Sequence, residues 1–230
     1  MPVNKSNASL IRLLQISDSA FPSGSFAFSN GLETLHKELH VLDKLTLIEI
    51  LNEQLLPRWL EFDRFFIRNA VNCGGDITKL VDLDSECHLQ NTNAALAESS
   101  RRIGRSLLTV HKKMATAGAE KFWNACSTSI LNNEAGYQPV VIGLVASGLD
   151  LSEQEAEIGA LYGAISTFFS SAIRLNLIGA IEAQRLIAKE IPNLDARLQN
   201  SLCSYPYSNA LLSEIAASRH QYLELSLFSN

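Results

Sequence analysis

Apolar residues recur along the chain every three to four positions, the spacing that places them on one face of a helix. Leu10, Leu13 and Leu14 follow this spacing in the first segment, where Asn7 or Ser9 would serve as the N-cap. This helix should end before Phe21-Pro22, because proline disfavours helical geometry in the residue before it. No alternating run is long enough to predict a sheet. The pattern therefore predicts an all-α fold, which we expect to be a single compact domain of about ten helices.

Loops at 22–29, at Gly74-Gly75 and at 132–136 divide the remaining helices. The predicted helices cover residues 32–39, 45–71 with a kink or a new start at Pro57, 88–117, 120–131, one opened by Pro139, 152–173, 177–191, 194–203 and 208–225. Ser152 and Glu155 have the spacing of a capping box, in which each side chain satisfies a backbone donor beside the other. No repeat and no linker rich in Gly, Pro and Ser is present, so we expect one domain over residues 1–230.

Composition narrows the class of protein. The chain has 230 residues, is 47% hydrophobic and carries a net charge of -5 without a basic stripe, so we expect no nucleic-acid partner. Its four cysteines form no C-x-x-C pair and no signal peptide precedes them, which predicts a cytoplasmic protein with reduced thiols. The uncharged stretch from 158 to 173 is shorter than the roughly 20 residues that a membrane span needs. We expect it to be a buried core helix.

Two glycine-containing segments lack the chemistry that their spacing suggests. Gly143 and Gly148 are spaced as in a phosphate-binding loop, but the lysine that would reach the phosphates is missing. Ser25 lacks the second glycine of a nucleophile elbow. We therefore expect no catalytic residues and no enzyme. His36 and His40 are four positions apart, a spacing that can bind a metal, but solvated helix histidines are the favoured interpretation.

The segment from 13 to 33 is the most specific pattern in the chain. It combines a leucine-rich helix with Pro22-Ser23-Gly24-Ser25-Phe26 and Ser29-Asn30-Gly31-Leu32-Glu33. This segment closely resembles the signature of the UreF family of urease accessory proteins. Further similar positions are the spaced aspartates Asp63, Asp76 and Asp84, the run Gly104 to Leu107, the start Pro139 to Gly143, the segment Arg174-Leu175 to Gly179, and the ending with Arg219-His220 and Leu227-Phe228. Ala180 replaces a glutamine, and Ser226 and Ser229 stand where arginines are common in the family.

The resemblance implies a non-enzymatic maturation factor that dimerises and binds no cofactor tightly. Proteins of this family join a docking accessory protein, UreD or UreH, to the GTPase UreG, which delivers nickel to apo-urease. The complex, rather than this chain, would handle the nickel, and whether GTP hydrolysis is stimulated or restrained stays open. The alternative is an autonomous nickel carrier that uses His36 and His40.

Three groups of residues are candidates for partner binding. They are the loop residues Phe21, Pro22, Gly24, Phe26, Phe28, Ser29, Gly31 and Glu33, the helix residues Arg101, Gly104 and Arg105, and Arg219, His220, Leu227 and Phe228 in a tail spanning 219–230. We expect one or two of the phenylalanine rings to pack inside, and Glu33 to contact the GTPase. The arginines either form a solvated face with Glu98 or link helices or an acidic partner. The apolar tail should become ordered on binding the docking protein.

Overall fold

A computed structural model describes residues 7–39, 43–128, 135–199, 203–223 and 226–229. These residues are helical or irregular and form no strand, which confirms the all-α fold class. They group into two compact units, unit 1 with Met1–Gly24, Phe66–Gln90 and Ser100–Gly163, and unit 2 with Ser25–Phe65, Asn91–Ser99 and Ala164–Asn230. A single domain over 1–230 stays a prediction. None of the helices in the described ranges combines the length and apolar character that a bilayer span requires.

Unit 1 is built around the apolar helix α9 (Gln138–Gly148), which packs against α6 (Ile77–Gln90) and α8 (Ala119–Thr128). It also contains α1 (Asn7–Ser17), most of α5 (Arg64–Asn72), most of α7 (Ala94–Lys113) and the first part of α10 (Glu153–Arg174). A Cβ on Gly143 would lie 2.5 Å from the Ala70 Cβ, and one on Gly148 would lie 2.5 Å from the Ala117 carbonyl oxygen. The phosphate-loop spacing therefore reflects close helix packing.

Unit 2 contains a helix that is interrupted around Pro57. α3 (Lys44–Ile50) continues through the π-helical segment η2 (Leu51–Leu55), α4 (Leu56–Arg58) and the π-helical segment η3 (Trp59–Asp63) into α5. Proline has no N–H to donate, and the two wider segments flank it, so the chain stays helical without a sharp break. The expected kink or new start at Pro57 is thus a local widening of one helix.

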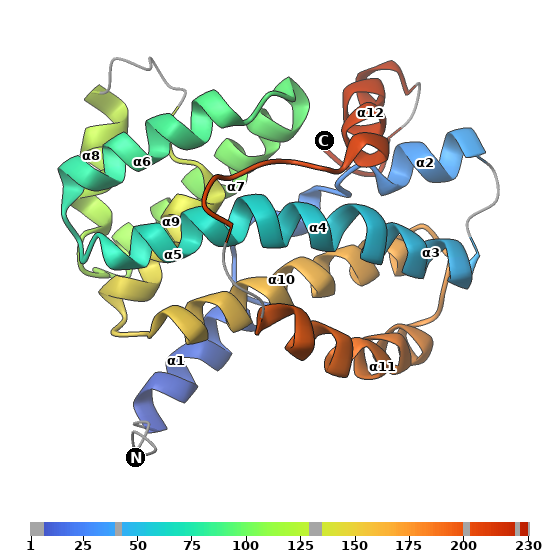
Figure 1. The fold of residues 1–230 in the computed structure, drawn as a ribbon, viewed down its shortest axis with the longest axis horizontal. Helices are drawn as coiled ribbons and strands as arrows, with labels where there is room; N and C mark the ends of the chain where they lie inside the picture. Colours follow the sequence, from blue (N-terminus) through green and yellow to red (C-terminus); the bar gives the residue numbers. More distant parts are fainter. Residues whose placement is uncertain (1–6, 40–42, 129–134, 200–202, 224–225, 230) are drawn as a thin grey trace. The chain divides into compact units, whose positions relative to one another are not determined.

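The rest of unit 2 includes the end of the signature segment, from Ser25 to Glu33. It comprises η1 (Ser25–Ala27), α2 (Leu32–Leu39), the second part of α10, α11 (Ala180–Leu198), α12 (Leu211–Arg219) and η4 (His220–Tyr222). Figure 1 shows α12 beside α2, and these two helices are in contact. This pairing joins the beginning of the unit to its C-terminal end.

Several helix boundaries differ from the predicted ones. The helix predicted over 88–117 is present as α7, but its predicted start at 88 is wrong, because residues 88–90 end α6 and the chain turns between Gln90 and Ala94. The Asp76 and Asn93 side chains accept N–H bonds from the first turns of α6 and α7, and so cap both helices. α11 continues through Pro192 to Leu198, so the predicted break between 191 and 194 is also wrong.

The capping box and the first helix are confirmed. Ser152 and Glu155 exchange the expected bonds, with Ser152 N donating to Glu155 Oε2 at 2.9 Å and Glu155 N donating to Ser152 Oγ at 3.3 Å. The first helix ends at Ser17, before Phe21-Pro22. The last helix was predicted over 208–225, but α12 covers only Leu211–Arg219, and residues 224–225 lie outside the described ranges.

Candidate interaction surface

The buried carboxylate of Glu33, in the first turn of α2, is the centre of the candidate surface in unit 2. Its Oε1 accepts the N–H of Leu227 at 2.7 Å and the Lys37 ammonium at 2.9 Å. Its Oε2 accepts the N–H of Phe228 at 3.2 Å and lies 3.0 Å from Nε2 of His220. Burial raises the pKa of Glu33, but the hydrogen bonds outweigh it and the net pKa is lowered. A charged carboxylate therefore holds the end of the chain.

Arg174, the last residue of α10, holds the same segment from another direction. Its guanidinium donates to the carbonyl oxygens of Phe26 and Leu227, the latter at 3.1 Å, and lies 4.1 Å from the centre of the Phe228 ring. Ser229 N donates to the Ala27 carbonyl oxygen at 2.6 Å. We call residues 226–229 the tail segment. It was expected to become ordered on binding a partner, and in this structure of the chain alone it lies against Glu33.

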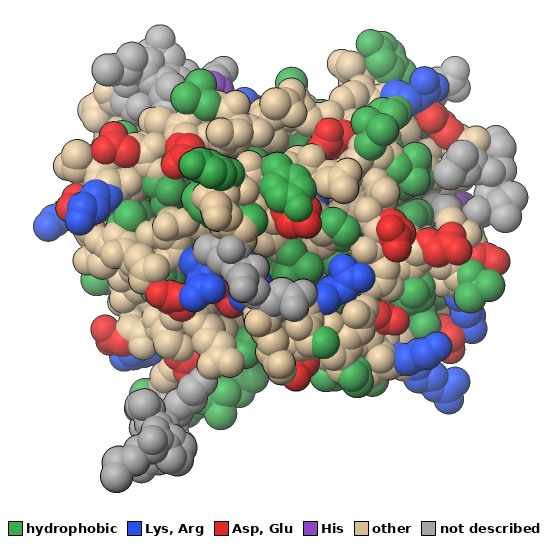
Figure 2. Space-filling model, in the orientation of Figure 1, with side chains coloured by type: hydrophobic (Ala, Val, Ile, Leu, Met, Phe, Trp, Pro, Cys, Tyr) green, Lys and Arg blue, Asp and Glu red, His purple; other side chains and the backbone are tan. Residues whose placement is uncertain are grey.

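Helix α12 presents its large apolar side chains outward. Leu211, Leu212 and Ile215 are 68%, 40% and 50% exposed, whereas the small residues of the helix, Ser213, Ala216 and Ala217, are buried. The buried side fits against Gly31, where an added Cβ would lie 3.0 Å from the Ala216 Cβ. Figure 2 shows hydrophobic side chains at the surface over α12. Such an exposed apolar helix face is typical of a surface that another molecule covers.

The signature residues 26–31 form the inner layer of this surface. Phe28 and Ser29 are buried and Phe26 is half-buried. Asn30 and Gly31 have φ angles of 52° and 86°, a left-handed turn that lets the chain enter α2 close to α12. Arg219 contacts Glu38 on α2 at 2.7 Å. The structure thus brings together the candidate residues of unit 2, which are Phe26, Phe28, Ser29, Gly31, Glu33, Arg219, His220, Leu227 and Phe228.

The earlier part of the signature belongs to unit 1. The half-buried Phe21 ring stacks on His111 with ring centres 5.4 Å apart, and Pro22 is exposed. A Cβ on Gly24, whose φ is 81°, would lie 3.0 Å from the Ser106 Oγ. Of the three phenylalanines only Phe28 is fully buried, which agrees with the expectation that one or two rings pack inside.

The arginine group on α7 packs within unit 1. Arg105 Nε donates to the Ala135 carbonyl oxygen at 2.9 Å, and Arg101 donates to the Tyr137 hydroxyl at 3.2 Å. Gly104 lies so close to the loop that a Cβ would be 2.1 Å from the Gly136 carbonyl oxygen. Of the two interpretations, these contacts favour a structural link between α7 and the loop before α9. A contact with an acidic partner stays a prediction.

Asp84 completes this link, and its role was missed at the sequence level. Its carboxylate accepts the N–H groups of Gly136 and Tyr137 at 2.7 and 2.8 Å. Burial raises the pKa of Asp84 to about 6, although these two bonds and the nearby Arg105 act to lower it. In the sequence, Asp84 stood out only as one of the spaced aspartates of the family resemblance and as an acidic residue between the apolar positions of α6. Neither signal identified its bonding partners, and an acidic residue at such a position usually lies on a solvated face.

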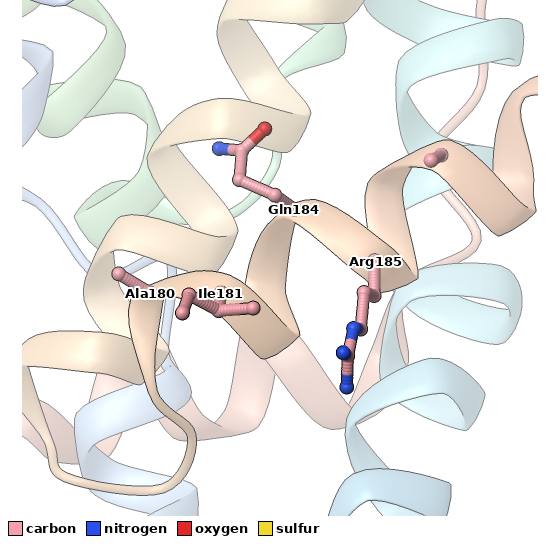
Figure 3. Close-up of a pocket in the computed structure, with 5 residues that line it drawn as sticks. Ala180, Ile181, Gln184 and Arg185 are labelled. Carbon is pink, nitrogen blue, oxygen red and sulfur yellow. The ribbon is translucent and has the colours of Figure 1, made fainter.

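Two further features concern metal binding and α11. Among the described residues, no group of three or more His, Cys, Asp and Glu side chains is arranged to hold a metal ion. His36 is half-buried and His40 lies outside the described residues, so the carrier alternative is untested. Figure 3 shows a shallow, mainly apolar hollow on α11, with Gln184 and Arg185 pointing away from each other. The hollow is lined by Ala180, Ile181, Gln184, Arg185 and Ala188.

Comparison of the sequence with known proteins shows which family it resembles. The sequence model of the UreF family matches residues 41–189. The chain is 28% identical to the urease accessory protein UreF of Trichodesmium erythraeum (strain IMS101), over 99% of this chain and 100% of that protein. It is 30% identical to the protein of the same name from Agrobacterium fabrum, over 96% of each chain. The corresponding protein of Haemophilus influenzae (strain Rd) is 26% identical over 98% of this chain and 97% of its own length.

Proposed function

The chain belongs to the UreF family of urease accessory proteins, and from this we propose that it is a non-enzymatic adaptor in urease maturation. It joins a UreD-like (UreH-like) docking protein and a UreG-like GTPase to apo-urease while nickel is inserted. The adaptor acts in the cytoplasm as a homodimer. Nickel is handled by the assembled complex, and the chain itself binds no cofactor tightly.

The observation that carries this proposal is the outward apolar face of α12. Leu211 and Ile215 lie one turn apart on it, and Tyr222 and Leu227, which follow the helix in the sequence, are 79% and 61% exposed. A helix that buries its alanines and exposes its leucines removes little apolar surface from water when the chain folds alone. A partner that covers the leucines would remove much more. We assign this face to the UreD-like docking protein, the partner that the tail was expected to bind.

The glycine packing supports a role other than nucleotide hydrolysis. Gly143 and Gly148 lie inside helix α9 and contact neighbouring backbone and side-chain atoms. Their N–H groups therefore belong to the helix backbone and do not form a phosphate-binding loop. The relatives reported above are named accessory proteins, in line with an adaptor.

The test is complex formation with the cognate UreD-like and UreG-like proteins, followed by pull-down and size-exclusion chromatography. The wild-type chain should co-elute with both partners. The double variant Leu211→Ser/Ile215→Ser should lose the UreD-like protein. Leu45→Ser is the matched control, because Leu45 is 74% exposed on α3 and lies outside this surface. Substitutions at such exposed positions usually change stability by no more than about 0.5 kcal/mol, so both variants should fold normally.

Two results would count against the proposal. Absence of any complex at micromolar concentrations would refute the adaptor role, and unchanged binding by the double variant would remove α12 from the docking surface. Tight nickel binding by the isolated chain, abolished by His36→Ala, would instead support the carrier alternative.

A further inference from the structure

Helix α12 begins at a residue that cannot cap it. The N-cap residue Ala210 has no side-chain acceptor, so the first N–H groups of the helix need acceptors from elsewhere. Gln54, in the π-helical segment η2, provides one, because its Oε1 accepts the N–H of Leu212 at 3.0 Å and that of Ser213 at 3.4 Å. These are the second and third residues of α12, the positions that an N-cap side chain normally serves. A residue 158 positions before Leu212 therefore caps the helix.

A second contact lies one turn further along the interrupted helix. The Arg58 guanidinium donates to the Ser208 hydroxyl at 2.7 Å and lies 3.8 Å from the Glu214 carboxylate. The Ser208 hydroxyl donates in turn to Glu214 Oε1, which connects the residues before α12 to its first turn. The Arg58 side chain is itself held in place, since it is 15% exposed and its guanidinium lies 4.8 Å from the centre of the Phe62 ring.

The backbone of η3 makes the third contact. The Glu61 carbonyl oxygen accepts the N–H of Tyr207 and the thiol of Cys203, each at 3.2 Å. Figure 1 shows the connection that leads into α12 along this helix. Residues 54, 58 and 61 are four and three positions apart, the spacing of neighbours on one side of a helix. Two of the three belong to π-helical segments, which are rare and often occur at functional sites.

We propose that Gln54 and Arg58 are positioning residues that fix the orientation of α12 and thereby keep its apolar face outward. They contact only the first turn of α12 and the residues before it, and Leu211 and Ile215 stay exposed. An outward leucine face opposes the hydrophobic effect, so polar contacts are needed to specify this orientation. The recognition of the face by the UreD-like docking protein rests on the proposed function, whereas the cap of α12 belongs to the chain alone.

The chemistry of the cap distinguishes it from ordinary packing. Gln54 acts through an acceptor oxygen, which glutamate retains at nearly the same length, and a carboxylate is favoured at the N-terminus of a helix. Methionine has a similar length and volume, but its thioether is only a weak acceptor. A residue that merely fills space would tolerate methionine, whereas a cap requires the oxygen. Gln54→Glu should therefore preserve the function that Gln54→Met removes.

The first arm of the test measures hydrogen exchange of the full chain alone. The amides of Leu212 and Ser213 should be protected in the wild type and in Gln54→Glu, whereas Gln54→Met should raise their exchange rates about tenfold. Glu53→Met is the matched control, because Glu53 is exposed on the same segment and takes no part in these contacts. Unchanged protection in Gln54→Met, or lost protection in Gln54→Glu, would overturn the role of Gln54.

Arg58→Met tests the second contact separately, and it does so even if Gln54→Met folds poorly. Loss of the guanidinium should release Ser208 and raise the exchange rates of the Tyr207 and Leu212 amides about tenfold, because the start of α12 then opens locally. Unchanged exchange of both amides would overturn the role of Arg58.

The second arm measures affinity for the UreD-like protein. Gln54→Met should weaken binding about fivefold, because the start of α12 must then be ordered during association, and Gln54→Glu should bind within about twofold of the wild type. Equal affinity of Gln54→Met and the wild type would overturn the link between the cap and docking. If the wild type binds no such partner, the proposed function fails, whereas the exchange arm still decides whether Gln54 and Arg58 hold α12.

Discussion

Replacing Gly104 by alanine should destabilise the protein, even though the same substitution in an ordinary helix is stabilising. Gly104 lies inside α7, where alanine favours the helix by about 1 kcal/mol over glycine. The added Cβ, however, would lie 2.1 Å from the Gly136 carbonyl oxygen, 2.8 Å from Gln138 N and 2.9 Å from the Tyr137 carbonyl carbon. All three atoms belong to the backbone, so no side-chain rotation can make room.

The expected magnitude follows from these opposing effects. Overpacking a filled site costs about 1–3 kcal/mol, and a clash with backbone places the cost at the upper end of that range. After the gain in helix propensity, the free energy of unfolding should fall by about 2 kcal/mol. For a chain of this size each kcal/mol shifts Tm by about 2–4 °C, so Gly104→Ala should lower Tm by about 4–8 °C.

Gly163→Ala provides the matched control within unit 1. Gly163 lies inside α10, and no atom lies within 4 Å of a Cβ added there. This variant should raise Tm by about 2–4 °C, because only the helix propensity changes. Circular dichroism at 222 nm during heating measures both shifts. If Gly104→Ala were as stable as the wild type, or if both variants shifted Tm in the same direction, close contact at Gly104 would be refuted.

Three further predictions concern titratable and capping side chains. The pKa of Asp84 is raised to about 6 from 3.8, so the stability of the wild type should fall as pH rises between these values. In thermal melts, Asp84→Asn should lack this decrease of Tm with pH. The lowered pKa of Glu33 gives stability that is present above pH 4.5 and lost as pH falls through the folded-state pKa, so the Tm difference between wild type and Glu33→Gln should shrink in acid. Asn93→Ala removes the cap of α7 and a bond to the Glu214 carbonyl oxygen, and should cost about 1–2 kcal/mol in urea unfolding.

Each of these has a result that would contradict it. Parallel pH slopes for wild type and Asp84→Asn would show that this carboxylate does not titrate in that range. A Tm difference for Glu33→Gln that stays constant down to pH 3 would exclude its charge as the source of stability. For Asn93, an unfolding midpoint equal to that of the wild type would mean that another group caps α7.

Helix periodicity predicted the fold class, and the spacing of Ser152 and Glu155 predicted the capping box, because both depend on neighbouring residues. Helix periodicity missed the break between α6 and α7, where no glycine or proline marks the turn. Asn93 ends the connection, and its side chain is held there by Glu214 and Ser218, more than a hundred residues away in the sequence. Such a boundary is decided by tertiary contacts. At Pro192 the error is the reverse: the proline predicted a break, but α11 continues through it and tolerates one missing hydrogen bond.

The candidate surface was foreseen in its residues but not in its geometry. The signature and tail positions were identified from the family resemblance, and the structure brings most of them together in unit 2. The burial of Glu33 could not be foreseen, because a glutamate in the first turn of a helix usually lies in water. Its partners Leu227 and Phe228 follow it by 194 and 195 positions. The orientation of α12 was also not predictable, because the leucines of a helix usually face the core, whereas those of α12 are exposed.

The two π-helical segments beside Pro57 have a consequence for comparing homologous chains. A π-helical segment holds one more residue than the α-helical turn it replaces, so each is the structural form of a single-residue insertion. Each extra residue would turn the following side chains by about 100° if the helix stayed regular, since an α-helix has about 3.6 residues per turn. Relatives that differ in length here should therefore place a one-residue gap at 51–55 or 59–63, where a deletion restores a plain α-helix and leaves both flanking faces in register.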